Sequence, residues 1–275
     1  MLKRTITGAC YVAILAGTFL LREFVDYRLF HLLTYIFLII GTYELQRMLS
    51  KFSDKFTGVS AIICSAICPI AFMLAENFLR RGVGVFAYIL VLAIFACIFS
   101  VYSLIKGFEL KRFGVNILHL VYPTVCLLFM FLANEEKADG FMILILSFVI
   151  SPISDVMAYF TGMAIGGKKL CPKISPKKTW AGAIGGTIGG GLGAILVYLV
   201  FKPTINFFSP VLFFLLVGLV VSVVNIFGDL LESLIKRKAG VKDSGKILPG
   251  HGGVLDRIDG TMFAVIAIYI AFLLV

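Results

Sequence analysis

Five carboxylates gather in one polar interval near the end of this sequence, and their spacing suggests chemistry. They are Asp229, Glu232, Asp243, Asp256 and Asp259. Carboxylates at close quarters repel one another and are usually found together where a hard cation such as Mg²⁺ neutralises them. Asp229 and Glu232 are three residues apart, and so are Asp256 and Asp259. Each of these two pairs would therefore share one face of a helix. The interval therefore favours a metal site.

Basic residues are interleaved with these acids in the same interval. They are Lys236, Arg237, Lys238, Lys242, Lys246 and Arg257. Lysine and arginine side chains hold phosphate oxygens. A last helix that begins near Gly253 would also offer free backbone N–H groups to an anion. The pattern predicts a site for a metal ion and a polyphosphate, and composition alone leaves open a solvated loop with isolated ion pairs.

Residues 233–259 resemble the signature of the phosphatidate cytidylyltransferase family, the CDP-diacylglycerol synthases. The matching positions are Ser233, Lys236-Arg237, Lys242-Asp243, Gly245, Leu248-Pro249, His251-Gly252-Gly253, Asp256-Arg257 and Asp259. The resemblance covers about residues 151–260 and also takes in Asp155, Ala158-Tyr159-Phe160, Gly162, the run 175–180, Gly228-Asp229 and Glu232. Ala181 departs from the pattern, because this family usually has Glu or Gln there. That departure suggests an activity weaker than the signature implies.

The resemblance implies that phosphatidate attacks the α-phosphorus of CTP, which yields CDP-diacylglycerol and pyrophosphate. On this basis we expect one or two Mg²⁺ ions on Asp229, Asp256 and Asp259. Lys242 and Asp243 would orient the triphosphate or a metal-bound water, and Asp256 completes the expected catalytic set. The expected phosphate contacts are Ser175, Lys177, Lys178, Arg237, His251, Gly252, Gly253 and Arg257, and Asp155 and Glu232 are further candidates.

Two other classes of function stay open at this point. A CTP-dependent lipid kinase acting on an alcohol would use similar metal chemistry but release CDP. A transporter would explain glycine-rich helices and acids at membrane depth. Its charged residues should lie at the midplane of both halves, whereas here they gather in one half.

The composition points to an all-α integral membrane protein. The 275 residues are 60% hydrophobic, with a mean hydropathy of +1.03, and an apolar helix of about 20 residues crosses a bilayer. We expect a polytopic bundle of about nine transmembrane helices with a polar cleft at the cytoplasmic face. Residues 1–138 would form a scaffold and 139–275 the catalytic half. The expected spans are 5–21, 29–49, 56–79, 83–105, 114–133, 140–162, 181–201, 207–235 and 260–275.

The net charge is +10, and the distribution of Lys and Arg among the loops indicates the orientation of the chain in the membrane. With the N-terminus in the cytoplasm, alternate loops hold 19 of the 25 Lys and Arg residues and the opposite loops hold 6. This bias follows the positive-inside rule. It predicts a cell-membrane (inner-membrane) protein whose site faces the cytoplasm, and it argues against nucleic-acid binding.

Two local patterns near the site lead to specific expectations. Ser175-Pro176 is typical of an N-cap followed by a first-turn proline, which would place Lys177 and Lys178 at the start of a helix. Asp155 lies inside a span, where it needs a partner, a metal or a water-filled cavity. Pairing with a lysine is the structural alternative to a functional role for Asp155.

Two further patterns concern packing. Glycines 182, 186 and 190, with 185, 189 and 193, form a face that allows close helix approach. This face would pack inside the bundle or between subunits of a homodimer. Glu44 precedes Arg47 by three residues, which suggests an ion pair near the membrane interface.

Overall fold

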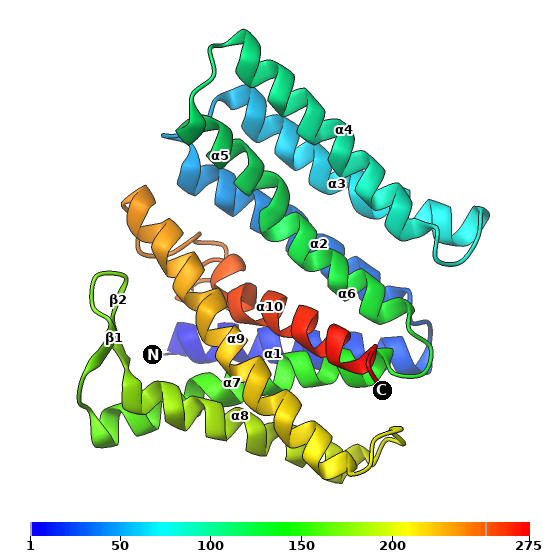
Figure 1. Cartoon of the computed structure of the whole chain (residues 1–275), viewed down its shortest axis with the longest axis vertical. Helices are drawn as coiled ribbons and strands as arrows, with labels where there is room; N and C mark the ends of the chain where they lie inside the picture. The colour runs from blue at the N-terminus through cyan, green and yellow to red at the C-terminus, as the bar shows by residue number, and fades with distance from the viewer. Residues whose placement is uncertain (1, 251) are drawn as a thin grey trace. The chain divides into compact units, whose positions relative to one another are not determined.

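The structure is a computed structural model that describes residues 2–250 and 252–275. Apart from one hairpin, the regular structure of these residues is helical (Figure 1), which confirms the all-α prediction. In chain order the elements are α1 (Leu2–Phe24), α2 (Leu29–Leu49), α3 (Lys55–Phe78), α4 (Gly84–Ile105), α5 (Leu110–Leu120), the π-helical turn η1 (Val121–Val125), α6 (Cys126–Glu135), α7 (Gly140–Ile165), β1 (Lys169–Cys171), β2 (Ser175–Thr179), α8 (Trp180–Phe201), α9 (Pro210–Ala239) and α10 (Leu255–Phe272).

Eight segments of the described chain are long and apolar enough to cross a membrane, and they coincide with the first eight predicted spans. The fifth comprises α5, η1 and α6. The ninth predicted span forms helix α10, which is not among the eight and has Asp256, Arg257 and Asp259 in its first two turns. The chain is therefore a multi-pass membrane protein.

The interruption in the fifth span has a local cause at Pro123. A proline has no backbone N–H and its ring clashes with the preceding turn of a helix. Tyr122 accordingly leaves the helical region, with φ −116° and ψ 116°, and the chain forms a π-helical turn. The buried Tyr88 hydroxyl of α4 donates a hydrogen bond to the Thr124 carbonyl at 2.8 Å, so part of the altered backbone is satisfied by a side chain.

The chain divides into two compact units. Unit 1 comprises Met1–Leu132 and Asp243–Asp256, and unit 2 comprises Ala133–Lys242 and Arg257–Val275. Unit 1 contains a core of buried residues from α3 to α6: Ala61, Cys64, Cys68, Phe72, Tyr88, Phe99, Leu120, Leu128 and Phe131. The predicted division at residue 138 into a scaffold and a catalytic half concerns function and stays a prediction.

In unit 2 the glycine face of α8 packs against α7 and α9. A Cβ at Gly186 would lie 2.9 Å from the Ser154 carbonyl oxygen of α7. A Cβ at Gly218 of α9 would lie 2.5 Å from the Gly190 carbonyl oxygen. Only glycine allows the backbones to approach this closely. Of the two expected arrangements, the structure therefore has the glycine face packed inside a bundle.

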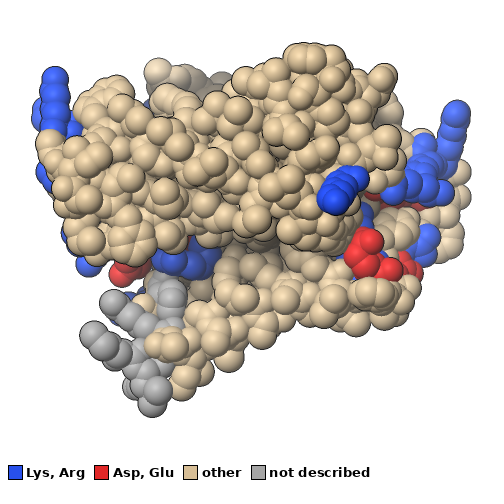
Figure 2. Space-filling view, turned by 90° about the horizontal axis from the view of Figure 1, so that it is seen from below, with Lys and Arg blue, Asp and Glu red and all other residues tan. Residues whose placement is uncertain are grey.

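The opposite face of α8 consists of exposed apolar side chains. Ile184, Ile188, Leu192 and Leu196 are each more than half exposed. In Figure 2, uncharged side chains cover most of the visible face. Such a surface suits contact with lipid, because hydrocarbon solvates apolar side chains and not charges.

The prediction of a helix start at Ser175 is wrong. Ser175–Thr179 is strand β2, which pairs with β1 in an antiparallel hairpin, with Lys169 opposite Thr179 and Cys171 opposite Ser175. A residue before proline prefers the extended conformation, and proline is tolerated on an edge strand. The helix starts at Trp180 instead, where the Thr179 hydroxyl oxygen accepts a hydrogen bond from the Gly182 N–H at 3.0 Å.

Candidate active site

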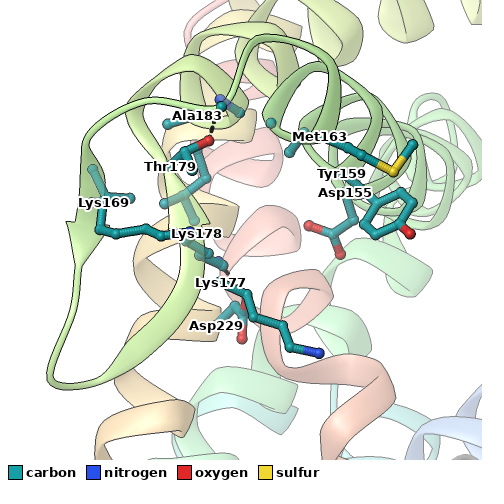
Figure 3. A pocket seen from close by; sticks show the side chains of 15 residues that line it. Asp155, Tyr159, Met163, Lys169, Lys177, Lys178, Thr179, Ala183 and Asp229 are labelled. Carbon is teal, nitrogen blue, oxygen red and sulfur yellow. Dashed lines mark hydrogen bonds and ion pairs between the residues drawn. The ribbon is translucent and has the colours of Figure 1, made fainter.

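Unit 2 contains a cavity of about 370 Å³ that combines lysines, carboxylates and apolar groups. Figure 3 shows Lys169, Lys177 and Lys178 on the hairpin, Asp155 and Tyr159 on α7, and Asp229 on α9. The remaining lining residues are Ala158, Gly162, Met163, Gly166, Leu170, Thr179, Gly182, Ala183 and Ile226. Four of the predicted site residues therefore line one cavity: Asp155, Lys177, Lys178 and Asp229.

Small residues hold the hairpin at the edge of this cavity. A Cβ added at Gly162 would lie 2.9 Å from the Thr179 hydroxyl oxygen, and one at Gly182 would lie 2.7 Å from the Ala158 carbonyl oxygen. The N-cap of α8 therefore lies directly against α7. Thr179 is the last residue of β2 and also the N-cap of α8. The backbone positions of Lys177 and Lys178 beside the cavity are therefore fixed by the start of α8.

Lys178 and Asp229 form an ion pair across the cavity lining. Their side chains are 24% and 28% exposed, and pairs with this much access to solvent contribute about 1 kcal/mol or less. Ser233 also donates a weak hydrogen bond to Asp229, at 3.4 Å. A charged ligand can therefore replace this ion pair at low cost.

Asp155 is oriented by a short chain of hydrogen bonds. The Ser151 hydroxyl donates to Asn225 Oδ1 at 2.6 Å, and Asn225 Nδ2 donates to Asp155 Oδ1 at 3.2 Å. The hydrogen-bond partner of Asp155 is thus an amide of α9, whereas Lys178 pairs with Asp229. Gly260 leaves room for these hydrogen bonds, since a Cβ there would clash with Asn225 Oδ1.

Asp259 adds a third carboxylate to the same electrostatic environment. Burial and the neighbouring Asp229 raise the pKa of Asp259 to about 6, although Glu232 and Lys236 act in the opposite direction. Glu232 itself is buried and accepts from Lys236 Nζ at 3.0 Å, one helical turn along α9. The predicted candidate Glu232 therefore takes part in a buried ion pair.

The donor set near the cavity fits a hard divalent cation in its chemistry. Asp155, Asp229 and Asp259 act on one another electrostatically, and a cation would relieve that repulsion. In the described part of the chain, no three His, Cys, Asp or Glu side chains are arranged closely enough to hold a metal ion. A cation held by three of these side chains would therefore require them to lie closer together than they do here.

The part of the signature that lies in unit 1, residues 243–256, is called the signature segment below and contains its own hydrogen-bond network. Asp256 Oδ2 accepts hydrogen bonds from the Ser244 N–H at 2.9 Å, the Ser244 hydroxyl at 2.9 Å and the Gly253 N–H at 2.8 Å. The Leu248 N–H donates to the Gly252 carbonyl at 3.0 Å, and Gly252 has a φ of +85°, which favours glycine. Asp256 therefore closes a turn between residues 244 and 256.

The N–H groups at the start of α10 are occupied, contrary to expectation. Glu44 accepts from the Val254 N–H at 3.1 Å and from the Leu255 N–H at 2.8 Å, and the Gly253 N–H binds Asp256. The expected ion pair of Glu44 with Arg47 is not formed among the described residues. Protein carboxylates thus take the donors that were expected to be free for an anion.

The comparison with protein families agrees with the signature. The profile of the cytidylyltransferase family matches residues 2–275. The chain belongs to the cytidylyltransferase family.

Several curated relatives of this family member are phosphatidate cytidylyltransferases. One from Brucella abortus biovar 1 is 42% identical over 151 residues, which is 55% of this chain and 54% of the relative. One from Staphylococcus epidermidis is 45% identical over 129 residues, 47% of this chain and 48% of the relative. One from Haemophilus influenzae is 40% identical over 132 residues, which is 48% of this chain and 46% of the relative. The chain spans about half the length of the curated relatives it matches.

The other predicted residues that the structure of this cytidylyltransferase family member describes lie outside the cavity lining. Arg237 is exposed and donates to the Ile174 carbonyl at 3.3 Å, so it ties α9 to the turn of the hairpin. Lys242, Asp243 and Arg257 are exposed, and Ser175 is half-buried at the start of β2. His251 lies outside the described residues. The roles predicted for these residues stay predictions.

Three residues of this family member were not predicted as site residues. Lys169 lines the cavity, and its place opposite Thr179 depends on the unforeseen hairpin. Asn225 orients Asp155, and an amide in an apolar span is a signal that could have pointed to it. Glu44 holds the signature segment from 200 or more residues away in sequence, which no local pattern indicates.

Proposed function

We propose that the chain is a phosphatidate cytidylyltransferase, which transfers CMP from CTP to phosphatidate and releases pyrophosphate. The observation that supports it best is the cavity of unit 2, where Lys169, Lys177 and Lys178 converge with Asp155 and Asp229. Lysines bind phosphate oxygens and carboxylates bind divalent cations. A nucleotide triphosphate and a phospholipid headgroup together require both kinds of group.

The lipid nature of one substrate is supported by the apolar part of the same lining. Ala158, Met163 and Ile226 lie in the cavity wall, and Tyr159 and Met163 are 65% and 64% exposed on α7, a candidate membrane span. A headgroup at the lysines could therefore keep its acyl chains beside apolar side chains. A soluble nucleotide alone would have no use for such a wall.

The proposed reaction is an in-line displacement at phosphorus. A phosphate oxygen of phosphatidate forms a bond to the α-phosphorus of CTP, and the bond from that phosphorus to the bridging oxygen of pyrophosphate breaks. The nucleophile is already anionic at neutral pH, so the chain needs no strong general base. Lys169, Lys177 and Lys178 would bind phosphoryl oxygens, reduce the repulsion between the two anions and hold them in line.

We propose Asp229 and Asp259 as ligands of Mg²⁺, with Asp155 beside them. When bound, Mg²⁺ would neutralise charge on the phosphates and stabilise the departing pyrophosphate. Asn225 would fix the orientation of Asp155 through its hydrogen bond. Lys178, released from Asp229, would be free to bind a phosphoryl oxygen. The expected metal-binding role of Asp256, and a second metal ion, remain predictions.

We propose that the site faces the cytoplasm of the cell membrane. The hairpin lies between two candidate spans, α7 and α8, in a loop with Lys168, Lys169, Lys173, Lys177 and Lys178. Such basic loops prefer the cytoplasmic side, where CTP is found.

The test is a product analysis with purified protein in detergent, given CTP, phosphatidate and Mg²⁺. The expected result is release of pyrophosphate that requires phosphatidate, with one CDP-diacylglycerol formed per pyrophosphate. Replacing phosphatidate by diacylglycerol is the matched control and should give no product. Release of CDP with an alcohol acceptor would instead indicate a lipid kinase. Substrate uptake by proteoliposomes without either product would indicate a transporter.

A further inference from the structure

A buried carboxylate of α2 holds the signature segment of unit 1. Glu44 is 1% exposed. Its Oε1 accepts from the Val254 N–H at 3.1 Å, and its Oε2 accepts from the Leu255 N–H at 2.8 Å. Glu44 Oε2 also lies 3.3 Å from the Ser244 hydroxyl and shares its single proton with the nearer Asp256 Oδ2. A buried carboxylate requires several donors, and here the donors come from both ends of residues 244–255.

Two glycines of the segment make space for this carboxylate. A Cβ at Gly245 would clash with Glu44 Oε1, and a Cβ at Gly253 would lie 2.5 Å from Glu44 Oε2. Neither glycine has a positive φ, so backbone conformation does not require glycine at these positions. A side chain at either position would instead displace the Glu44 carboxylate from its hydrogen bonds.

Ser244 connects Glu44 to a second carboxylate. Its hydroxyl lies 3.3 Å from Glu44 Oε2 and 2.9 Å from Asp256 Oδ2, and its N–H also donates to Asp256 Oδ2. The two carboxylates together bind donors at Ser244, Gly253, Val254 and Leu255. The network therefore fixes where the turn ends and where α10 begins.

We propose that Glu44 is a positioning residue for the proposed transfer reaction. It acts by fixing residues 244–255, and thereby Asp243 and Asp256 at the two ends of this stretch, without contacting a substrate. The catalytic part of this inference rests on the proposed function, whereas the structural part does not. A small displacement of groups that orient the substrates reduces the fraction of bound substrate that is aligned for reaction. Loss of Glu44 should therefore lower kcat more than it raises KM.

The first test replaces Glu44 by Gln. Glutamine has nearly the same size as glutamate and keeps one acceptor oxygen, but its second polar group is an NH₂ donor. That NH₂ would face a backbone N–H, so one of the hydrogen bonds to Val254 or Leu255 would be lost. We expect kcat to fall about tenfold or more, with KM for CTP and phosphatidate changed less than about threefold. Glu44→Asp keeps the charge and should recover part of kcat. Glu109→Gln alters an exposed carboxylate of the same unit and should leave kcat unchanged.

Hydrogen exchange provides a readout that is independent of the reaction. Peptides that cover Val254 and Leu255 should exchange about tenfold faster or more in Glu44→Gln than in the wild-type and Glu109→Gln proteins. Unchanged exchange at these amides would overturn the proposal. If exchange rises but kcat stays at the wild-type value, the positioning role is also wrong. If the wild-type protein does not transfer CMP, the proposed function fails, and exchange alone decides whether Glu44 holds the segment.

A second variant keeps the test decisive if Glu44→Gln does not fold. Ser244→Ala removes only the hydroxyl that joins the two carboxylates and is expected to preserve the helices. We expect kcat to fall about fivefold and exchange at Leu255 to rise by a similar factor. Wild-type kcat and exchange in Ser244→Ala would count against the network as a positioning device.

Discussion

The cavity of unit 2 and the signature segment of unit 1 use the same residue types in opposite ways. In the cavity, Asp155 and Asp229 line a space together with lysines, and the Lys178–Asp229 ion pair is partly exposed. In the signature segment, Asp256 and Glu44 bind backbone N–H groups and a serine hydroxyl. The first arrangement leaves charge available for a ligand, and the second uses it to hold the chain.

This difference shows that a motif residue need not contact a substrate. Asp229 and Asp256 both lie at positions covered by the family resemblance, but only Asp229 lines the cavity of its unit, whereas Asp256 closes a turn. A carboxylate with three donors on one oxygen is costly to disturb. We therefore expect substitutions in the two regions to differ in kinetic signature as well as in size.

Removing divalent cations should have the largest effect and act through the cavity. We expect chelation to abolish pyrophosphate release to below about one thousandth of the initial rate, because Asp155, Asp229 and Asp259 would then face the triphosphate without a counter-ion. Activity should return on addition of Mg²⁺. Full activity after exhaustive chelation would rule out the proposed metal role of these carboxylates.

Asp229→Asn should have the next largest effect. The variant removes a charge from the cavity and the ion-pair partner of Lys178, and we expect kcat/KM to fall about 10³-fold. Asp139→Asn, at the start of α7 and outside the cavity lining, is the control. Steady-state pyrophosphate release measures both. A loss smaller than that of Glu44→Gln would reverse the contrast drawn between the two regions.

Lys177→Ala and Lys178→Ala should have smaller effects that differ in kind from that of Glu44→Gln. Each removes a cation that would bind phosphate in the ground state and in the transition state, so we expect KM to rise and kcat/KM to fall about 10- to 100-fold. Lys173→Ala, in the turn of the same hairpin and outside the lining, is the control. Unchanged KM in both variants would argue against phosphate binding at the hairpin.

Much of the fold could be predicted from sequence because hydrophobic length determines it. Eight spans were located within a few residues, since about 20 apolar residues form a helix whenever they lie in lipid. The glycine spacing on α8 also indicated its packing face. The spans and the glycine face depend on local sequence, so they can be predicted from one amino-acid sequence alone.

The cavity residues that could be predicted are those covered by the family resemblance over residues 151–260. Asp155, Lys177, Lys178 and Asp229 were identified and do line one cavity. The hairpin was not predicted because Ser175-Pro176 is compatible with a helix start and with an edge strand. The segment is a strand because Thr179 pairs with Lys169, and this pairing is not visible in the local sequence. Glu44 was assigned to a local ion pair because its true partners, Val254 and Leu255, are 210 and 211 residues away.

Ala181 offers the smallest and most informative change. The resembling family usually has Glu or Gln at this position, in the first turn of α8 beside the cavity-lining Gly182 and Ala183. We expect Ala181→Gln to raise kcat/KM by about two- to tenfold, because one added hydrogen bond to a substrate contributes about 1 kcal/mol. Ala181→Leu adds similar volume without polar atoms and should give no gain. If Gln lowers activity as much as Leu does, α8 of this chain has packed around alanine, and the cavity does not need the missing side chain.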